Sequence, residues 1–451
     1  MPGSSGWLGD SGGTSKIDGK LMIHAQGAGS NAVNLLGAGT QMTIGADSSL
    51  SSTQGPGVLL QGTPTFSAGS GLTVDALDAF VLTAATTTMS LTQTQVTAQD
   101  KIWLATGGGA TQFNGHAGKY QGSSAVDAGT TLNLTLDTAA QWILTGDSSY
   151  TQLSLDSGAI YQVSGANRTV TGLLVNRAGV VDLSGNSPQV SDTFTTVGSY
   201  SGGGQIRLDT ALGDSSSPTD IFVVNGDVSG VTTLDVRNAG GVGAATTGNG
   251  IPVVRVTGMA PAGSFALATG QVTAGSYTYV LNQVGDTWYL QSKALPTESS
   301  VTCAPLELND ADNQVSACTI RLSQPAPAQG LTVHLALPQA SSRYSTTCTP
   351  SMLVPAGATT LNCTITATPN TAVGDGNVVA TLAINPPTAA GTYTVAGAPA
   401  VITVRDDDQT TPPVSNGNAT PVPTLGQWAL TLLSLVLAGF AAVRLRRVWA
   451  H

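Results

Sequence analysis

Short runs in which apolar and polar residues alternate dominate the first two thirds of the chain. In segments 131–136 and 152–155, for example, leucine occupies every second position, and threonine, serine, asparagine or glutamine occupies the others. Such alternation is typical of strands that bury one face. The runs recur about every ten residues from 17 to 293, separated by glycine, asparagine, aspartate and serine. The pattern predicts an all-β fold.

Two all-β architectures have strands at this spacing: a sandwich or barrel, and a parallel β-helix. No proline-rich linker divides residues 17–293, and a sandwich of that length would require several domains. A β-helix instead adds coils of about 20 residues, each of which buries its inner face on its neighbours. We therefore expect a parallel β-helix (solenoid) here. A glycine- and serine-rich segment, 1–16, precedes it, and the true N-terminus is left open.

Residues 297–405 form a second predicted domain. Strand-like runs at 331–337, 360–366 and 400–404 belong to a set of six or seven within this segment. That number of short strands in about 110 residues is typical of a small immunoglobulin-like (Ig-like) β-sandwich. All four cysteines of the chain lie in it, which predicts disulfides and an oxidising compartment. A zinc site is the alternative, but its usual C-x2-C spacing is absent.

Four cysteines allow three pairings. We expect the two pairs that are adjacent in the sequence, which are Cys303–Cys318 and Cys348–Cys363.

Charge and aromatic content narrow the function. Only 9% of the residues are charged and the formal net charge is -10, which argues against nucleic acid as a partner. Aromatic residues make up 5%, so small side chains are expected to fill the solenoid. An open solenoid end exposes core and edge strands and requires a cap. The predicted cap residues are the aromatic side chains at its C-terminal end, Tyr277, Tyr279, Trp288 and Tyr289.

Residues 206–293 resemble the pertactin-like autochaperone segment of autotransporter passengers. The resemblance implies a right-handed parallel β-helix in which 17–205 are passenger coils and 206–293 are a stable folding seed. The residues that carry it lie at 212–220, 223–230, 236–241, 246–254, 274–279 and 288–290.

The end of the chain has the composition of a membrane tail. A linker rich in threonine, proline and asparagine spans 406–421, and the tail spans 422–448. The apolar run from Leu425 to Val443 is long enough, as a helix, to cross a bilayer. The basic cluster that follows would stay on the cytoplasmic side, with all upstream residues outside.

This tail resembles the IPTL-type sorting signal of Gram-negative bacteria. The resemblance implies an exosortase-like transpeptidase as partner, with cleavage near the motif; the alternative is a permanent single-pass anchor. The residues that carry it are Val422, Pro423, Thr424, Leu425, Trp428, Arg444, Arg446 and Arg447.

Chemistry-bearing residues are few. Asp406, Asp407 and Asp408 follow a final strand that resembles a Calx-β repeat, and their oxygens suit Ca²⁺. The alternative is a solvated acidic linker, and no other cofactor is expected. The segment Gly9 to Gly13 copies the nucleophile motif of chymotrypsin-like proteases, but the first histidine, His24, follows it. No catalytic residues are therefore expected.

These observations favour an exported bacterial cell-surface protein of structural or adhesin-like character, and not an enzyme. The expected route is an inner-membrane-anchored precursor that reaches the cell surface, the outer membrane or the medium, although no signal peptide is visible after Met1. Two alternatives remain: a secreted β-helix enzyme acting on polysaccharide, and the remnant of a serine-protease autotransporter. The sequence names no ligand.

Overall fold

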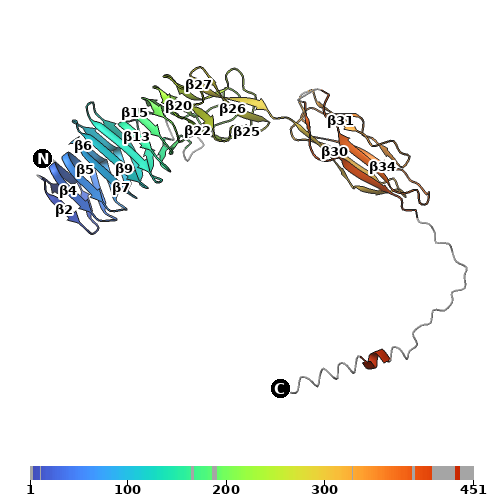
Figure 1. Ribbon diagram of the computed structural model, residues 1–451, viewed down its shortest axis with the longest axis horizontal. Coiled ribbons are helices and arrows are strands. Elements are labelled where there is room, and N and C mark those ends of the chain that lie inside the picture. Colours follow the sequence, from blue (N-terminus) through green and yellow to red (C-terminus); the bar gives the residue numbers. More distant parts are fainter. Residues whose placement is uncertain are drawn as a thin grey trace. The chain divides into compact units, whose positions relative to one another are not determined.

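The computed structural model describes residues 4–10, 12–163, 167–184, 190–327, 329–388, 392–408 and 432–436. They divide into two compact units, Met1–Leu295 and Pro296–His451 (Figure 1). Each unit is described by itself.

The first unit is built from two large sheets. In the described residues the first sheet has 14 strands. Two of them lie off the main order: β2 (Thr14–Ile17) pairs with β4, and β3 (Met22–Ala25) pairs with β5. The other strands, in spatial order, are β1 (Ser5–Gly9), β4 (Asn31–Ile44), β5 (Ser49–Ala68), β6 (Thr73–Ala85), β8 (Gln95–Thr106), β10 (Lys119–Val126), β12 (Gln141–Leu144), β14 (Ile160–Gln162), β16 (Val180–Asp182), β19 (Gln205–Thr210), β22 (Thr232–Asn238) and β24 (Phe265–Leu267).

The second sheet has 13 strands within the described residues, including the short β18 (Tyr200–Ser201), which pairs with β15, and β21 (Val228–Ser229), which pairs with β18. The other strands, in spatial order, are β7 (Thr87–Thr92), β9 (Ala110–His116), β11 (Thr131–Asp137), β13 (Ser148–Leu155), β15 (Arg168–Asn176), β17 (Thr193–Val197), β20 (Ile221–Val224), β23 (Ile251–Val256), β27 (Thr287–Ala294), β26 (Tyr277–Val284) and β25 (Val272–Ala274).

Successive strands from β6 to β17 alternate between the two sheets, and each pairs in parallel with the strand one coil away. Tyr120 pairs with Trp142 and Trp142 with Tyr161, so these coils take about 20 residues each. The predicted all-β solenoid is confirmed (Figure 1). The right-handed winding that the resemblance implies stays a prediction.

Alternation in the sequence decides which side chains enter the core. In β11, Leu132, Leu134 and Leu136 are at most 1% exposed, whereas Asn133 and Thr135 between them lie on the outer face and are partly exposed. Successive side chains of a strand point to opposite faces, so each coil presents one apolar and one polar row.

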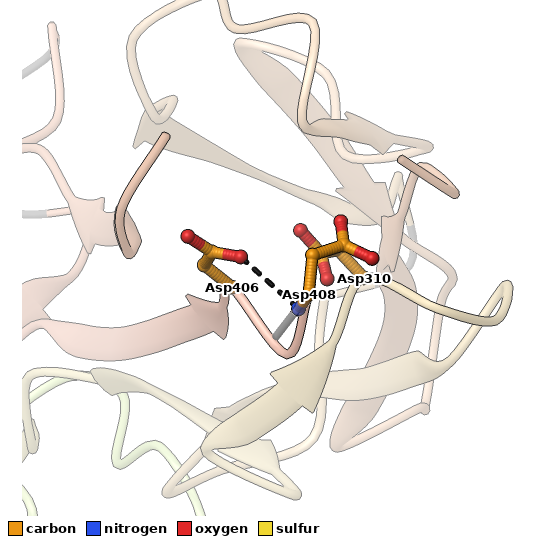
Figure 2. A group of neighbouring side chains, drawn as sticks. All are labelled: Asp310, Asp406 and Asp408. Carbon is orange, nitrogen blue, oxygen red and sulfur yellow. Dashed lines mark hydrogen bonds between the residues drawn. The ribbon is translucent and has the colours of Figure 1, made fainter. Parts of the chain in front are cut away.

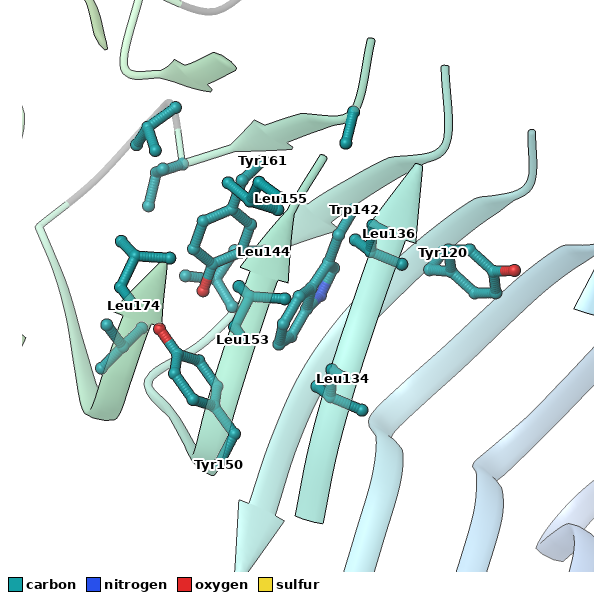
Figure 3. Close-up of a cluster of buried hydrophobic side chains, with 14 of the residues drawn as sticks. Tyr120, Leu134, Leu136, Trp142, Leu144, Tyr150, Leu153, Leu155, Tyr161 and Leu174 are labelled. Atoms are coloured by element: carbon teal, nitrogen blue, oxygen red, sulfur yellow. The ribbon is translucent and has the colours of Figure 1, made fainter. Parts of the chain in front are cut away.

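The core contains a continuous aromatic spine, with neighbouring ring centroids 4.8–6.5 Å apart. Most core residues are alanine, valine and leucine, as expected, but the expectation that the aromatic side chains concentrate at the C-terminal end is wrong. Figure 3 shows the middle of the spine around Trp142 and Tyr161. The spine residues are Phe80, Trp103, Phe113, Tyr120, Trp142, Tyr150, Tyr161, Phe194, Tyr200, Phe222, Phe265 and Trp288.

The chain reverses direction at the C-terminal end of the solenoid. β27 runs antiparallel to β23, β26 antiparallel to β27, and β25 antiparallel to β26. This three-stranded antiparallel segment covers the edge of β23, where parallel stacking would otherwise continue.

The second unit contains two five-stranded sheets in its described residues, which share one buried core. The Ig-like assignment stays a prediction. The first sheet, in spatial order, is β32 (Tyr344–Thr346), β34 (Thr360–Ala367), β30 (Val315–Leu322), β28 (Glu298–Ala304) and β36 (Thr394–Val395). The second sheet is β29 (Glu307–Asn309), β37 (Ala400–Arg405), β35 (Val378–Ile384), β31 (Leu331–Ala336) and β33 (Ser351–Val354).

Two disulfides, Cys303–Cys318 and Cys348–Cys363, cross-link this unit, and both are pairs expected from the sequence. Each closes a sequence separation of 15 residues, for which loop-closure entropy predicts about 3 kcal/mol of stabilisation. Reduction is therefore expected to lower the free energy of unfolding of the second unit by about that amount per bond. Thermal unfolding with and without reductant measures this, and the cysteine-free first unit is the internal control. Equal shifts in both units would contradict the prediction.

The predicted membrane helix lies outside the described residues, apart from 432–436, which are helical. Within the described chain no helix combines the length and the apolar character needed to cross a bilayer.

Candidate functional site

The four predicted cap residues lie on the antiparallel hairpin formed by β26 and β27. Tyr279 is fully buried, and its hydroxyl donates to the carbonyl oxygen of Gly213 at 2.8 Å and accepts from the amide of Ala244 at 2.9 Å. Trp288 packs edge-on against the ring of Phe265, with centroids 4.9 Å apart. Tyr277 and Tyr289 are half-buried. The hairpin thus covers the end of the core and holds the loops at Gly213 and Ala244, and its role as a folding seed stays a prediction.

A buried carboxylate organises the coils just before this hairpin. Asp220 is fully buried, and its Oδ1 accepts from the backbone amides of Ser191 and Asp192 at 3.1 and 3.0 Å. Its Oδ2 accepts from the amide of Asp209 at 2.8 Å. Ser191 has a φ of 124°, which a non-glycine residue rarely adopts, so the carboxylate holds a strained turn in place.

A group of three carboxylates lies at one edge of the second unit (Figure 2). Asp310 follows β29, and Asp406 and Asp408 follow β37. Because β29 and β37 pair in parallel, their C-terminal ends meet at the same edge. One carboxylate oxygen from each aspartate lies within 4.8 Å of the others, and Asp406 Oδ1 accepts from the Asp408 amide at 3.2 Å.

Burial and neighbouring charges shift the pKa values of the aspartates at this edge. Arg343 forms ion pairs with the fully buried Asp310 and with Asp375. Burial acts to raise the pKa of Asp310, but hydrogen bonds from Asp407 and Arg343 outweigh it and hold that pKa below its usual range. Burial, together with the charges of Asp310 and Asp406, raises the pKa of Asp408.

The structure changes the predicted calcium ligands. It brings Asp406 and Asp408 together with Asp310, whereas Asp407 is outside this group and donates its backbone amide to Asp310 at 3.3 Å. Asp310 is fully buried and Asp406 and Asp408 are half-buried, so a fully solvated linker does not describe them. Carboxylate oxygens suit Ca²⁺, but Arg343 already neutralises part of the charge, and calcium binding stays a prediction.

Calcium is expected to raise the unfolding temperature of the second unit, and Asp408→Asn to reduce that shift. Asp408 Oδ2 lacks a hydrogen-bond partner among the described residues, so it is available as a ligand. The exposed Asp312→Asn is the matched control. Thermal unfolding with calcium or with chelator measures both, and equal shifts in the two variants would rule out Asp408 as a ligand.

Without calcium, Asp408→Asn is expected to stabilise the second unit at neutral pH. A carboxyl group whose pKa is raised by folding adds stability below its unfolded pKa, near 4, and loses it as pH rises through the folded pKa. Asp408→Asn should therefore raise the unfolding temperature in chelator at pH 7 and have little effect at pH 3.

The sorting residues Val422, Pro423, Thr424, Leu425 and Trp428 lie outside the described residues, as do the three arginines after them. Ser11 of the protease-like motif also lies outside, and the strands on either side of it are solenoid strands paired with β4.

Two segments of the chain match known protein families, one in the solenoid and one in the tail. Residues 169–281 match Autochaperone Domain Type 1, and residues 420–447 match the IPTL-CTERM motif. The resemblance to autotransporter passengers with a C-terminal sorting tail is confirmed. The autochaperone match begins at β15, upstream of the predicted 206, and ends within β26.

The relatives include several autotransporters. The probable autotransporter YfaL of Escherichia coli K12 is 37% identical over 139 residues, which cover 30% of this chain and 11% of that protein. The adhesin BmaC autotransporter of Brucella suis is 38% identical over 121 residues, covering 24% and 4%. The autotransporter adhesin/invasin TibA of E. coli O78:H11 is 26% identical over 265 residues, covering 58% and 22%.

The matched regions are thus a small part of each relative's length. Among solved structures, the Haemophilus influenzae Hap adhesin aligns with 60% of this chain and 33% of its own, at 15% identity and a TM-score of 0.30.

Proposed function

We propose that this chain is an exported, surface-displayed passenger that adheres through the outer face of its solenoid, and that an exosortase-like enzyme processes its tail. Two relatives carry adhesin in their names, which supports an adhesive role. The word autotransporter in the names of these relatives and the two disulfides support an extracytoplasmic location.

The observation that carries the adhesion proposal is a row of polar side chains on neighbouring strands. Thr88, Gln112, Asn133 and Gln152 occupy successive register positions on β7, β9, β11 and β13. All four are at least partly exposed. Hydroxyl and amide groups held about 4.8 Å apart on a rigid sheet offer a ligand a regular set of donors and acceptors.

Adhesion is tested with cells that display the full chain. We expect these cells to autoaggregate and to coat an abiotic surface more than cells without it, and Gln112→Ala with Asn133→Ala to reduce both. Met22→Ala, an exposed residue on β3 away from this row, is the control. Equal behaviour of cells with and without the chain would contradict the proposal.

Processing is tested by the mass and location of the mature product. A surface or released product that ends near Thr424 is expected, and Pro423→Ala should retain the full-length chain in the inner membrane. A full-length wild-type product in the inner membrane would make this a tail-anchored protein and remove the sorting proposal.

A further inference from the structure

Three side chains from successive coils meet on the outer face of the second solenoid sheet. Ser90 lies on β7, His116 on β9 and Asp137 on β11. Both Thr92, two residues after Ser90, and Asp137 are register partners of His116. All three therefore belong to the same outward face, and they are separated by about one coil each along the chain.

Their hydrogen bonds form one chain. Ser90 Oγ lies 3.0 Å from His116 Nε2, and His116 Nδ1 lies 2.6 Å from Asp137 Oδ1. With a carboxylate at Nδ1, the imidazole carries its proton there and leaves Nε2 to accept from the serine hydroxyl. Thr138 Oγ1 donates to Asp137 Oδ1 at 3.0 Å and fixes the carboxylate in turn.

The other histidines of the described chain lack the arrangement of a serine at Nε2 and a carboxylate at Nδ1. His24 and His334 each contact a serine, Ser51 and Ser351, but through Nδ1, at 2.8 and 3.1 Å. No carboxylate within the described residues is bonded to either ring. A histidine beside a serine is thus common on these sheets, whereas the serine at Nε2 with a carboxylate at Nδ1 distinguishes His116.

An amide donor lies next to the serine. Asn114 is the register partner of Ser90 on β9, and its Oδ1 accepts from Gln112 Nε2 at 3.1 Å. That bond leaves Asn114 Nδ2, which has no acceptor among the described residues, to donate to a group at Ser90. A side-chain amide in this position is a suitable donor to a tetrahedral oxyanion.

A groove lies near Ser90, although Ser90 itself does not line it. It has a volume of about 520 Å³ and is lined mainly by threonine, with Gln112 and Asn133. Thr88 lines the groove and lies two residues from Ser90 on the same exposed face of β7. Eight of the ten lining residues carry a hydroxyl or an amide group, and threonine methyl groups, proline and alanine supply apolar surface between them. This mixture suits a polyhydroxylated substrate such as a sugar, which has both hydroxyl groups and C–H faces.

We propose that Ser90, His116 and Asp137 form a hydrolytic site for O-acyl esters carried on a polyhydroxylated substrate such as an acylated glycan. Ser90 Oγ forms a bond to the ester carbonyl carbon while its proton passes to His116 Nε2. The carbon–alkoxide bond then breaks, and the alcohol leaves with that proton. Water, deprotonated by His116, releases the carboxylic acid from Ser90.

In this mechanism Asp137 stabilises the charged imidazole and Asn114 stabilises the oxyanion. The inference goes beyond the adhesive role and does not depend on it, because adhesion should persist in Ser90→Ala. It also differs from the sequence expectation that the chain carries no catalytic residues.

The test uses the full-length protein and a fluorophosphonate probe, with the labelled peptide identified by mass spectrometry. We expect labelling at Ser90 that is lost in Ser90→Ala and His116→Ala and unchanged in Ser51→Ala, the matched serine beside His24. Hydrolysis of p-nitrophenyl acetate should fall at least about 10²-fold in Ser90→Ala, Asp137→Asn and Asn114→Ala.

Release of acetate from an O-acetylated polysaccharide tests the substrate class in the same variants. Circular dichroism should show each variant folded, since all the substituted side chains lie on the outer face. Absence of labelling at Ser90, or equal labelling of Ser51, would overturn the proposal. Labelling without acetate release would overturn the assignment of the substrate as an acylated glycan.

Discussion

Trp142→Ala is expected to destabilise the solenoid by about 3–5 kcal/mol. Trp142 is fully buried in the middle of the spine, with Trp103 and Tyr161 centroids 5.1 and 4.8 Å away. Its indole Nε1 donates to the carbonyl oxygen of Gly122 at 3.0 Å. Truncation would leave a cavity between two coils and a buried carbonyl without its donor. Urea unfolding followed by circular dichroism measures the loss.

The adjacent Gln141→Ala is the control for this substitution. Gln141 is on the outer face of the same strand and donates to Gln162 Oε1 at 2.8 Å, so we expect a loss below about 1 kcal/mol. A similar loss for both variants would show that the spine contributes no more than the outer rows.

Asp220→Ala is the second substitution with a large expected effect, about 3–5 kcal/mol. It would leave three backbone amides without an acceptor, and each buried unsatisfied group costs about 1–3 kcal/mol. It would also release the strained turn at Ser191. Because Asp220 lies within the autochaperone match, we expect the substitution to slow refolding from urea as well as to destabilise the folded state.

Asp214→Ala is its control. Asp214 is exposed and accepts from Ser216 within the same loop, so its loss should cost less than about 1 kcal/mol. If Asp220→Ala refolds at the wild-type rate and stability, the buried carboxylate has no role in the folding seed.

The solenoid could be predicted from the sequence because inward and outward positions alternate within single strands, as in residues 131–136. The spine could not, because its members are single aromatic residues about one coil apart, such as Trp142 and Tyr161. Coil length varies along the chain, so the register that stacks them is set by turns whose lengths the alternation does not encode.

The same reason explains which site residues the sequence missed. Asp310 joins Asp406 and Asp408 only through the parallel pairing of β29 and β37, nearly 100 residues apart. Ser90, His116 and Asp137 form no local motif in the sequence, because their spacing follows the coils. Histidine, serine and aspartate separated by one coil length are the signal that would have found them.

The change from parallel to antiparallel pairing between β23 and β27 determines where such a chain can gain coils during evolution. Duplicating residues 141–159, which is one coil in this register, would stack a second Trp142 on the first and preserve the parallel pairing, so passenger length can increase upstream in whole coils. A coil inserted after β23 would instead meet the antiparallel β27 and find no parallel partner. Variation in length among such chains should therefore be confined to the part before the hairpin.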